Sequence, residues 1–308
     1  MDRDEAYHSP VMVEEVLEYL KPGRGGLYFD GTLGGGGHTK AILEAGVTAC
    51  VIGVDQDTEA LGVAERRLEQ FGERVTLVHG NFADEAEALS SLLAGALLDL
   101  GISSHQIDEQ SRGFSFRSGT PLDMRMDATS SDPTAADLLN ELSERELADL
   151  FFHYGDERRS RRLAGEIVRT RKIKPFDTSD DLTSAMERSL GSRLEAQDKA
   201  RIFQALRIAV NEELSVLERA LEALREHLGE DGVLVVLSYH SLEDRRVKDA
   251  FREWSRSCIC PPELPVCVCR GHALGETLTK RPLSPSPDEV SRNVRSRSVR
   301  MRAWRKAA

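Results

Sequence analysis

Short apolar runs and amphipathic segments alternate over the first hundred residues of this chain. Four runs have the length and aliphatic content of buried strands, and the segments between them repeat apolar residues at helical spacing. We expect strands over residues 27–30, 49–55, 74–78 and 96–100, and helices over 38–44, 58–70 and 84–93. This alternation predicts an α/β fold with a parallel, doubly wound sheet, in which ligands bind at the carboxyl ends of the strands.

The fifth strand lies far along the chain. The next aliphatic run comes only at residues 232–238, so the connection is several times longer than an ordinary helical crossover. We therefore expect a mainly helical inserted domain over 106–212, serving substrate recognition, and a sheet domain formed by 1–105 and 213–308. Helices are expected over 135–140, 143–154 (with a capping box from Ser143 to Glu146), 160–171 and 179–190, and a helical stretch over 197–227.

Two further elements are expected after the fifth strand. The segment Ser241-Leu242-Glu243-Asp244 is typical of a capping box, which opens a helix ending at Trp254. The tail alternates apolar and basic residues over 299–304, which predicts a strand with one apolar face and one basic face.

A glycine-rich turn over residues 30–37 follows the first expected strand and limits the choice of ligand. A Walker loop needs Lys-Ser/Thr after its last glycine, but Gly37 is followed by His38. A dinucleotide fingerprint counted from Gly34 would need glycine at position 39, where the chain has threonine. Asp55 ends the second strand, where a carboxylate can accept both ribose hydroxyl protons. The pattern favours a ligand with a ribose but no pyrophosphate, such as S-adenosylmethionine.

Composition places the chain among ordinary globular proteins. Its 308 residues are 40% hydrophobic, and no apolar run approaches the length of a membrane span. The acidic, polar start is unlike a signal peptide, so we expect a cytoplasmic protein with reduced cysteines and no membrane association.

Charge is unevenly distributed along the chain. The net charge of −11 argues against a globally basic nucleic-acid binder. Two basic stretches stand out, however: residues 158–174 hold eight Lys/Arg against one acid, and residues 290–308 hold seven Lys/Arg and no acid. Such stretches indicate either local phosphate contacts or simply solvated faces.

Eight segments, in order along nearly the whole chain, closely resemble the bacterial 16S rRNA cytosine-N(4) methyltransferases of the MraW/RsmH family. They are HSPV (8–11), DGTLGGGGH (30–38), LDLGISS (98–104), RGFSF (112–116), PLDMRMD (121–127), FQALRI (203–208), SLEDR (241–245) and RSRS (295–298). The chain departs from the family pattern at His105 and Val294, where proline is usual before Gln106 and Arg295.

The resemblance implies a Rossmann-like methyltransferase with a helical insert. It would transfer a methyl group from S-adenosyl-L-methionine to the exocyclic N(4) amine of a cytidine in the decoding region of 16S rRNA, with 16S rRNA or the small ribosomal subunit as partner. The oligomeric state, including a homodimer, is left open. Carried over by position, the cofactor contacts would be Gly36, Gly37, His38, Asp55, Phe82, Asp99 and Gln106.

The residue that accepts the proton from the target amine is not fixed by the sequence. A cytosine amine is a poor nucleophile because its lone pair is delocalised, so the site must align it and accept its proton. Many amino-methyltransferases carry Asp/Asn-Pro-Pro-Tyr after the fourth strand, but Asp99 is followed here by Leu-Gly-Ile. The candidates are Asp99, Ser103 and His240, with Ser104 and Asn211 as further polar residues nearby.

Several of these assignments have a structural alternative. Phe82 fits the adenine face or the protein core, and His38 fits a cofactor contact or a simple helix start. Phe114 and Phe116 fit either a stacking wall for an extruded base or core packing. His240 likewise fits a proton acceptor or a structural histidine.

Four cysteines form the pattern C-x-C…C-x-C. Zinc is one interpretation of Cys258, Cys260, Cys267 and Cys269, but the single-residue spacing is less usual than C-x-x-C, and we favour a free-thiol hairpin with no required metal. Two other functions remain as alternatives. One is an amino-methyltransferase acting on another RNA or on DNA, and the other is an rRNA assembly factor with a vestigial cofactor pocket.

Overall fold

The computed structural model describes residues 10–191, 194–261, 266 and 268–308. The chain divides into two compact units, Met1–Gly101 with Leu214–Ala308, and Ile102–Glu213. From the sequence we placed these boundaries at 105/106 and 212/213.

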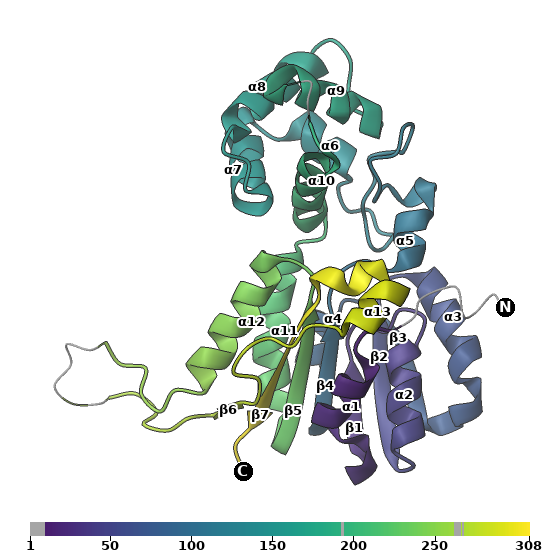
Figure 1. Ribbon diagram of the computed structural model, residues 1–308, viewed down its shortest axis with the longest axis vertical. Helices are drawn as coiled ribbons and strands as arrows, with labels where there is room; N and C mark the ends of the chain where they lie inside the picture. The colour runs from purple at the N-terminus through teal and green to yellow at the C-terminus, as the bar shows by residue number, and fades with distance from the viewer. Residues whose placement is uncertain (1–9, 192–193, 262–265, 267) are drawn as a thin grey trace. The chain divides into compact units, whose positions relative to one another are not determined.

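The first unit is built on a seven-stranded, mostly parallel sheet (Figure 1). Its strand order is β3-β2-β1-β4-β5-β7-β6, in which β7 runs antiparallel to both of its neighbours. This arrangement confirms the predicted α/β fold with a doubly wound sheet. The strands are β1 (Gly26–Asp30), β2 (Ala49–Asp55), β3 (Val75–His79), β4 (Leu93–Asp99), β5 (Leu228–Ser238), β6 (Gly275–Thr277) and β7 (Arg300–Lys306).

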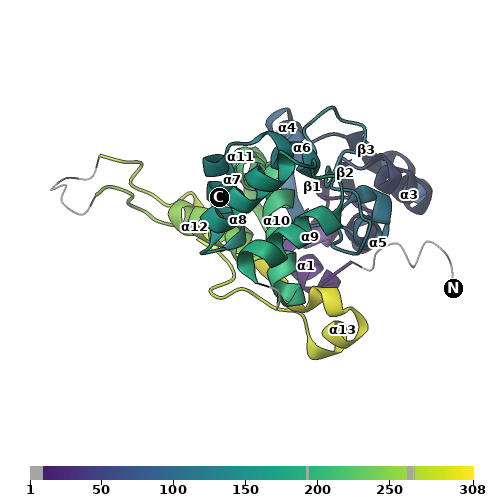
Figure 2. The same cartoon turned by 90° about the horizontal axis from the view of Figure 1, so that it is seen from above.

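Helices cover both faces of this sheet, because the strands are apolar on both sides. On β5, Leu234 and Val236 pack with one set of helices, whereas Val233, Val235 and Leu237 pack with the other. Seen from above, α4 and α11 lie on one side of the strands and α1 on the other (Figure 2). The helices of one face are α1 (Val13–Leu20), α2 (Gly37–Ala45) and α3 (Thr58–Leu68), and those of the other are α4 (Phe82–Glu87), α11 (Glu213–His227) and α12 (Ser241–Trp254).

The start of β4 differs from the prediction. The helix expected over 84–93 ends at Glu87, and Leu93 already belongs to β4, where it is buried and pairs with Leu228 of β5. Pairing and burial in the sheet therefore override the helical spacing of this segment. For the same reason β5 begins at Leu228, before the predicted start at 232.

The C-terminal strand was predicted in the correct place, but only part of its expected basic face is exposed. Met301 and Ala303 are buried on the apolar face as predicted, whereas on the other face Arg300 is exposed and Arg302 and Trp304 are buried. The Arg302 guanidinium is compensated by the carboxylate of Asp244, with an Nε–Oδ1 distance of 2.6 Å. The period-two pattern is present, but one of its cations is a core residue.

The second unit is helical and has its own apolar core. Ser143 and Glu146 form the predicted capping box, and two of the helices have the predicted bounds. The core includes Leu147, Phe151, Leu163, Ile167, Met186 and Phe203. The helices are α5 (Ser104–Asp108), α6 (Ala135–Glu141), α7 (Glu144–Gly155), α8 (Ser160–Arg171), α9 (Ser179–Leu190) and α10 (Ala196–Val210).

The helical stretch expected over 197–227 is interrupted. Helix α10 ends at Val210, Asn211 caps it, and Glu212 adopts a left-handed conformation with φ 47° before α11 begins. The Asn211 side chain stabilises the break, since its amide donates to the carbonyl of Met124 at 2.8 Å and accepts from the N–H of Met126 at 2.8 Å. Among the described helices, none has the length and apolarity that a membrane crossing requires.

Candidate active site

Three acids end neighbouring strands of the sheet. Asp30, Asp55 and Asp99 close β1, β2 and β4, and β1 lies between the other two. Parallel strands bring their carboxyl ends to one edge, so the three carboxylates share the edge at which such sheets bind ligands. Burial raises the pKa of Asp30, whose carboxylate accepts a hydrogen bond from Thr39 at 2.7 Å.

The glycine-rich turn joins the first two of these strands. The backbone N–H of Gly34 donates to Asp55 Oδ2 at 2.7 Å. Gly34 and Gly36 have φ of 52° and 77°, values that favour glycine, and Gly36 is the N-cap of α2. A Cβ on Gly36 would lie 3.0 Å from Leu68, whereas a Cβ on Gly34 would point into open space. The turn therefore presents open backbone beside a fixed carboxylate and the start of a helix, which fits a nucleoside ligand with a carboxylate.

Asp55 is held by two backbone donors. Besides Gly34, the N–H of Asp57 donates to Asp55 Oδ1 at 2.9 Å. Burial raises the pKa of Asp55 to about 6, although these two hydrogen bonds act in the opposite direction. The carboxylate is thus oriented by the backbone.

Asp99 lies in a cluster with Tyr239 and His38. The Tyr239 hydroxyl donates to Asp99 Oδ1 at 2.9 Å, and Asp99 Oδ2 is 3.6 Å from Nδ1 of His38. The backbone N–H of Asp99 donates to Thr32 Oγ1 at 2.6 Å. Burial, followed by the negative charge of Asp99, raises the pKa of Tyr239, so its hydroxyl stays a neutral donor.

His38 is a buried residue at the second position of α2. Its Nε2 lies 2.9 Å from the carbonyl oxygen of Val11, while Nδ1 faces Asp99. His38 thus links the segment before α1 to the strand edge. It occupies a helix start, as the structural alternative expected, and at the same time borders the acidic cluster.

Tyr239 was not predicted from the sequence as a site residue. An aromatic residue directly after a buried strand usually belongs to the core, but this one follows β5 at the ligand edge and carries a hydroxyl. The sequence carried one indication of a site role: Tyr239 lies between Ser238, which ends β5, and His240, a candidate site residue.

His240 has a structural role. It is the N-cap of α12, where its Nδ1 accepts from the N–H of Glu243 at 3.4 Å and its Nε2 lies 3.0 Å from Glu243 Oε1. The predicted capping box at Ser241 is therefore wrong by one residue, because an imidazole nitrogen replaces the expected hydroxyl. Glu243 Oε2 also accepts from the N–H of Tyr239 at 2.8 Å, which fixes the backbone that presents that side chain.

Phe82 is the first residue of α4 and is half-buried. Asn81 caps this helix by accepting from the N–H of Ala83 at 2.9 Å, which sets where Phe82 points. Phe82 packs partly against the core, and its Cβ would be 3.0 Å from a Cβ added to Gly31. The core alternative is therefore partly correct, and the Cβ of Phe82 lies beside the glycine turn.

The remaining predicted residues belong to the second unit. Ser103 and Gln106 bond to each other at the start of α5: the N–H of Ser103 donates to Gln106 Oε1 at 3.0 Å, and the N–H of Gln106 donates to Ser103 Oγ at 3.1 Å. The Asn211 side chain forms hydrogen bonds with the backbone of Met124 and Met126. The structure thus brings together Gly36, Gly37, His38, Asp55, Phe82 and Asp99 within the first unit, and places Ser103 and Gln106 in the second.

The two phenylalanines of the insert, Phe114 and Phe116, differ in how they pack. Phe114 packs against the core of the second unit, whereas Phe116 keeps 39% of its surface exposed and meets Phe203 edge-on at 5.9 Å. Gly113 is required locally, because a Cβ would lie 2.8 Å from the Pro121 carbonyl oxygen.

Many cations of the two basic stretches have internal partners. In the insert, Arg169 pairs with Glu166 at 2.6 Å and Lys174 with Asp181 at 2.5 Å. In the tail, Arg300 and Arg302 share Asp244. Other exposed cations of the two stretches include Arg158, Arg161, Arg162 and Lys172 in the insert and Arg292, Arg295 and Arg297 in the tail.

The open parallel sheet, the glycine turn after β1 and the acids at the strand ends define a Rossmann-like methyltransferase that uses S-adenosylmethionine. Residues 5–307 match the model of the MraW methylase family. The chain belongs to this family.

Curated relatives agree over almost the whole chain. The Ribosomal RNA small subunit methyltransferase H of Gemmatimonas aurantiaca is 52% identical over 310 residues, covering 99% of this chain and 97% of that protein. Proteins of the same name from Geotalea uraniireducens and Geobacter sulfurreducens are 47% and 48% identical, each alignment covering 97% of this chain and 98% of the relative.

Proposed function

We propose that the protein methylates the exocyclic N(4) amine of a cytidine in the decoding region of 16S rRNA. One observation carries the proposal: an Asp99 carboxylate, oriented by Tyr239, lies at the same strand edge as the turn and the acid suited to a nucleoside cofactor. The full-length relationship to rRNA small-subunit methyltransferases supplies the substrate class.

Residues of the first unit would hold the cofactor. The N–H of Gly37, at the start of α2, suits a carboxylate, and Asp55 suits the two ribose hydroxyls. The N–H of Gly36 donates to the carbonyl of Leu33 at 2.8 Å, so the assignment of Gly36 as a cofactor contact rests on the family resemblance. Phe82 offers a face for adenine. For Gln106 the assignment rests on the family resemblance alone. When bound, S-adenosylmethionine supplies a methyl group on an already activated sulfonium.

Asp99 is the proton acceptor in this proposal. Tyr239 occupies Oδ1, so Oδ2, on the side of His38, is the oxygen that can accept a hydrogen bond from the target amine. Accepting that hydrogen localises the nitrogen lone pair and takes up the proton as the new bond forms. The alternative role of Asp99 is to hold the cofactor's ammonium group. Ser103 and His240 are less suited, because each is engaged at a helix start.

No metal takes part in the transfer step in this proposal, because the sulfonium needs no Lewis acid. The RNA is held instead by the exposed arginines of α8 and of residues 292–297. Their charges suit a phosphate backbone, and the acidic remainder of the chain discourages indiscriminate binding. The small ribosomal subunit in the cytoplasm is the proposed setting.

A labelling experiment tests the reaction. The protein is incubated with methyl-labelled cofactor and either undermethylated small subunits or free 16S rRNA, and the labelled nucleoside is mapped. We expect N(4)-methylated cytidine at one position. Label on another base or atom would favour a different amino-methyltransferase. Tight cofactor binding with no labelled product on either substrate would favour the assembly-factor alternative.

A further inference from the structure

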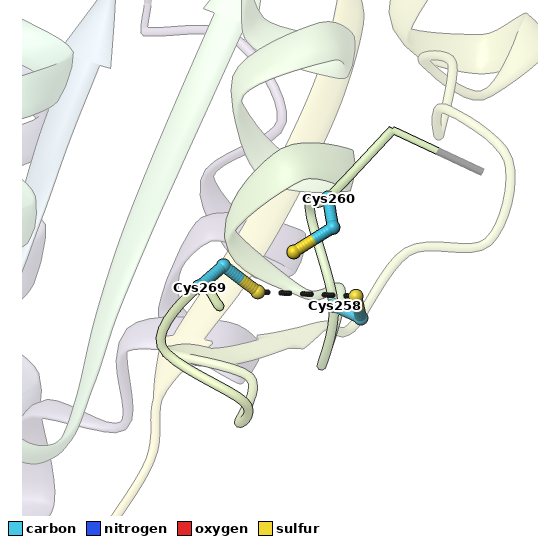
Figure 3. A group of neighbouring side chains, drawn as sticks. All are labelled: Cys258, Cys260 and Cys269. Atoms are coloured by element: carbon cyan, nitrogen blue, oxygen red, sulfur yellow. Dashed lines mark hydrogen bonds between the residues drawn. The ribbon is translucent and has the colours of Figure 1, made fainter. Parts of the chain in front are cut away.

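Three cysteine thiols come together beyond the end of α12 (Figure 3). They lie in the segment between α12 and β6, residues 255–274, which we call the excursion. Cys258 and Cys260 lie on its outgoing arm, and Cys269 lies on its returning arm. All three sulfur atoms are within 4.8 Å of one another, and the Sγ atoms of Cys258 and Cys269 are 3.8 Å apart. Cys267, the remaining cysteine of the pattern, lies outside the described residues.

The spacing of these sulfur atoms fits a tetrahedral metal site. Zinc–thiolate bonds are about 2.3 Å long, and two such ligands at a tetrahedral angle are about 3.8 Å apart. The Cys258–Cys269 separation of 3.8 Å matches this value. It is far longer than a disulfide bond, which is about 2.05 Å.

Backbone donors point at two of the sulfurs. The N–H of Ile259 donates to Cys269 Sγ at 3.3 Å, and the N–H of Val268 donates to Cys260 Sγ at 3.4 Å. Each bond crosses from one arm of the excursion to the other. Only the thiolate form binds metal, and N–H donors favour the thiolate over the neutral thiol.

The excursion itself has little else to hold it together. Between Trp254 and Gly275, the described residues form no helix or strand. Its base is fixed by the Arg270 guanidinium, which donates to the carbonyl of Glu253, and by the Leu274 N–H, which donates to the carbonyl of Trp254 at 2.8 Å. Farther out, Val268 is 77% exposed, so an apolar core does not stabilise this part. A metal link between the arms would close a loop of this length effectively.

We propose that Cys258, Cys260 and Cys269 bind one zinc ion as thiolates. An all-sulfur donor set selects zinc over magnesium or calcium, which prefer oxygen ligands. The three described thiolates supply three of the four positions of a tetrahedral site, and the site links the two arms of the excursion. From the sequence we favoured free thiols, and the arrangement of the sulfur atoms is the reason for the present proposal. The zinc has a structural role, separate from methyl transfer.

The test uses the full chain, purified without chelator and with a phosphine reductant. We expect one zinc per chain by elemental analysis. Serine variants of Cys258, Cys260 and Cys269 should each weaken zinc binding by more than about 100-fold, since losing even an outer-shell partner costs 10–100-fold. Cys50→Ser is the matched control, because Cys50 is a half-buried cysteine on β2 and not part of the cluster, and this variant should bind zinc like the parent.

Spectroscopy on the unmodified chain keeps the proposal testable if the variants misfold. Cobalt should give thiolate charge-transfer bands and tetrahedral ligand-field bands, and zinc absorption-edge data should show at least three sulfur neighbours at about 2.3 Å. A zinc shell made of nitrogen and oxygen would overturn the proposal, as would zinc content that is negligible or is unaffected by the three serine variants. An intact mass that shows a disulfide in the reduced, zinc-supplied protein would overturn it too.

Discussion

At the scale of single residues, Asp55 shows how the fold prepares a chemical group. The carboxylate is buried at the end of β2, and burial raises its pKa to about 6 against the hydrogen bonds from Asp57 and Gly34. The folded protein therefore holds this proton more tightly than the unfolded chain, whose aspartate pKa is about 4. Its contribution to the free energy of unfolding is largest below about pH 4 and is lost as the pH rises through about 6.

Cofactor affinity should depend on pH in the opposite direction. The ribose hydroxyls need an ionised acceptor, so we expect the affinity for S-adenosylmethionine to be level above pH 7 and to fall by up to about tenfold per pH unit below the pKa of Asp55. Calorimetry over a pH series measures this. Asp55→Ala should bind more weakly by about 1.5–3 kcal/mol and should lose the dependence. An unchanged pH profile in that variant would assign the titration to another group.

Tyr239 orients Asp99, so removing its hydroxyl should affect turnover. We expect Tyr239→Phe to lower the methyl-transfer rate by about tenfold or more, because the acceptor loses its fixed position. Tyr28→Phe is the control: Tyr28 is buried, whereas Tyr239 is half-buried, and the Tyr28 hydroxyl faces backbone carbonyls near the start of β1. Single-turnover rates of the two variants compare them at equal cofactor saturation. Equal rates would remove Tyr239 from the proposed mechanism.

At the scale of elements, glycine substitutions can distinguish the effect of the turn between β1 and α2 on stability from its proposed effect on cofactor binding. Gly34 and Gly72 have φ of 52° and 53°, and an added Cβ meets no atom within 4 Å at either position. Gly34→Ala and Gly72→Ala should each destabilise the protein by about 1–2 kcal/mol, because alanine disfavours positive φ. Only Gly34→Ala should weaken cofactor binding, since its methyl group would project into the open space at the turn where the cofactor is proposed to lie. Denaturant unfolding and calorimetry on both variants check this, and equal cofactor affinities would move the ligand away from the turn.

Elements with strong local signals could be predicted from the sequence, and those set by distant contacts could not. Helices α8 and α9 have the predicted bounds, because apolar spacing and end signals agree over these segments. The break after α10 was missed because Asn211 binds the backbone near Met124, a contact that joins distant parts of the chain. The boundary between α4 and β4 was missed for the same kind of reason, since Leu93 is fixed by pairing with β5.

The same distinction applies to the site. The glycine turn and Asp55 carry a recognisable spacing, so sequence and resemblance together suffice to single them out. Tyr239 carries none, and the cap at His240 uses a residue type that cap preferences do not lead one to expect. The burial of Arg302 depends on Asp244, which lies on another element. Alternating basic residues in a tail therefore do not indicate by themselves which cations face solvent.

At the scale of the whole molecule, charge is the property that matters for an RNA substrate. The chain carries a net charge of −11, and many cations of its two basic stretches are engaged internally. Charge reversal at Arg302 would leave two acids together in a buried site and would disrupt folding. We therefore assign the proposed RNA contacts to exposed arginines such as Arg161 and Arg162 of α8.

Adjacent arginines on two helices give a matched test of RNA binding. We expect the double variant Arg161→Glu/Arg162→Glu, on α8, to weaken 16S rRNA binding and to lower the slope of log affinity against log salt by about 0.7 for each phosphate that the variant no longer neutralises. The control is Arg66→Glu/Arg67→Glu on α3, which makes the same change in net charge on the sheet unit. Filter binding over a salt series measures both, and cofactor affinity should stay at the parent value in each. If the two variants lose RNA affinity equally, net charge rather than α8 governs the encounter, and the proposed contact surface is wrong.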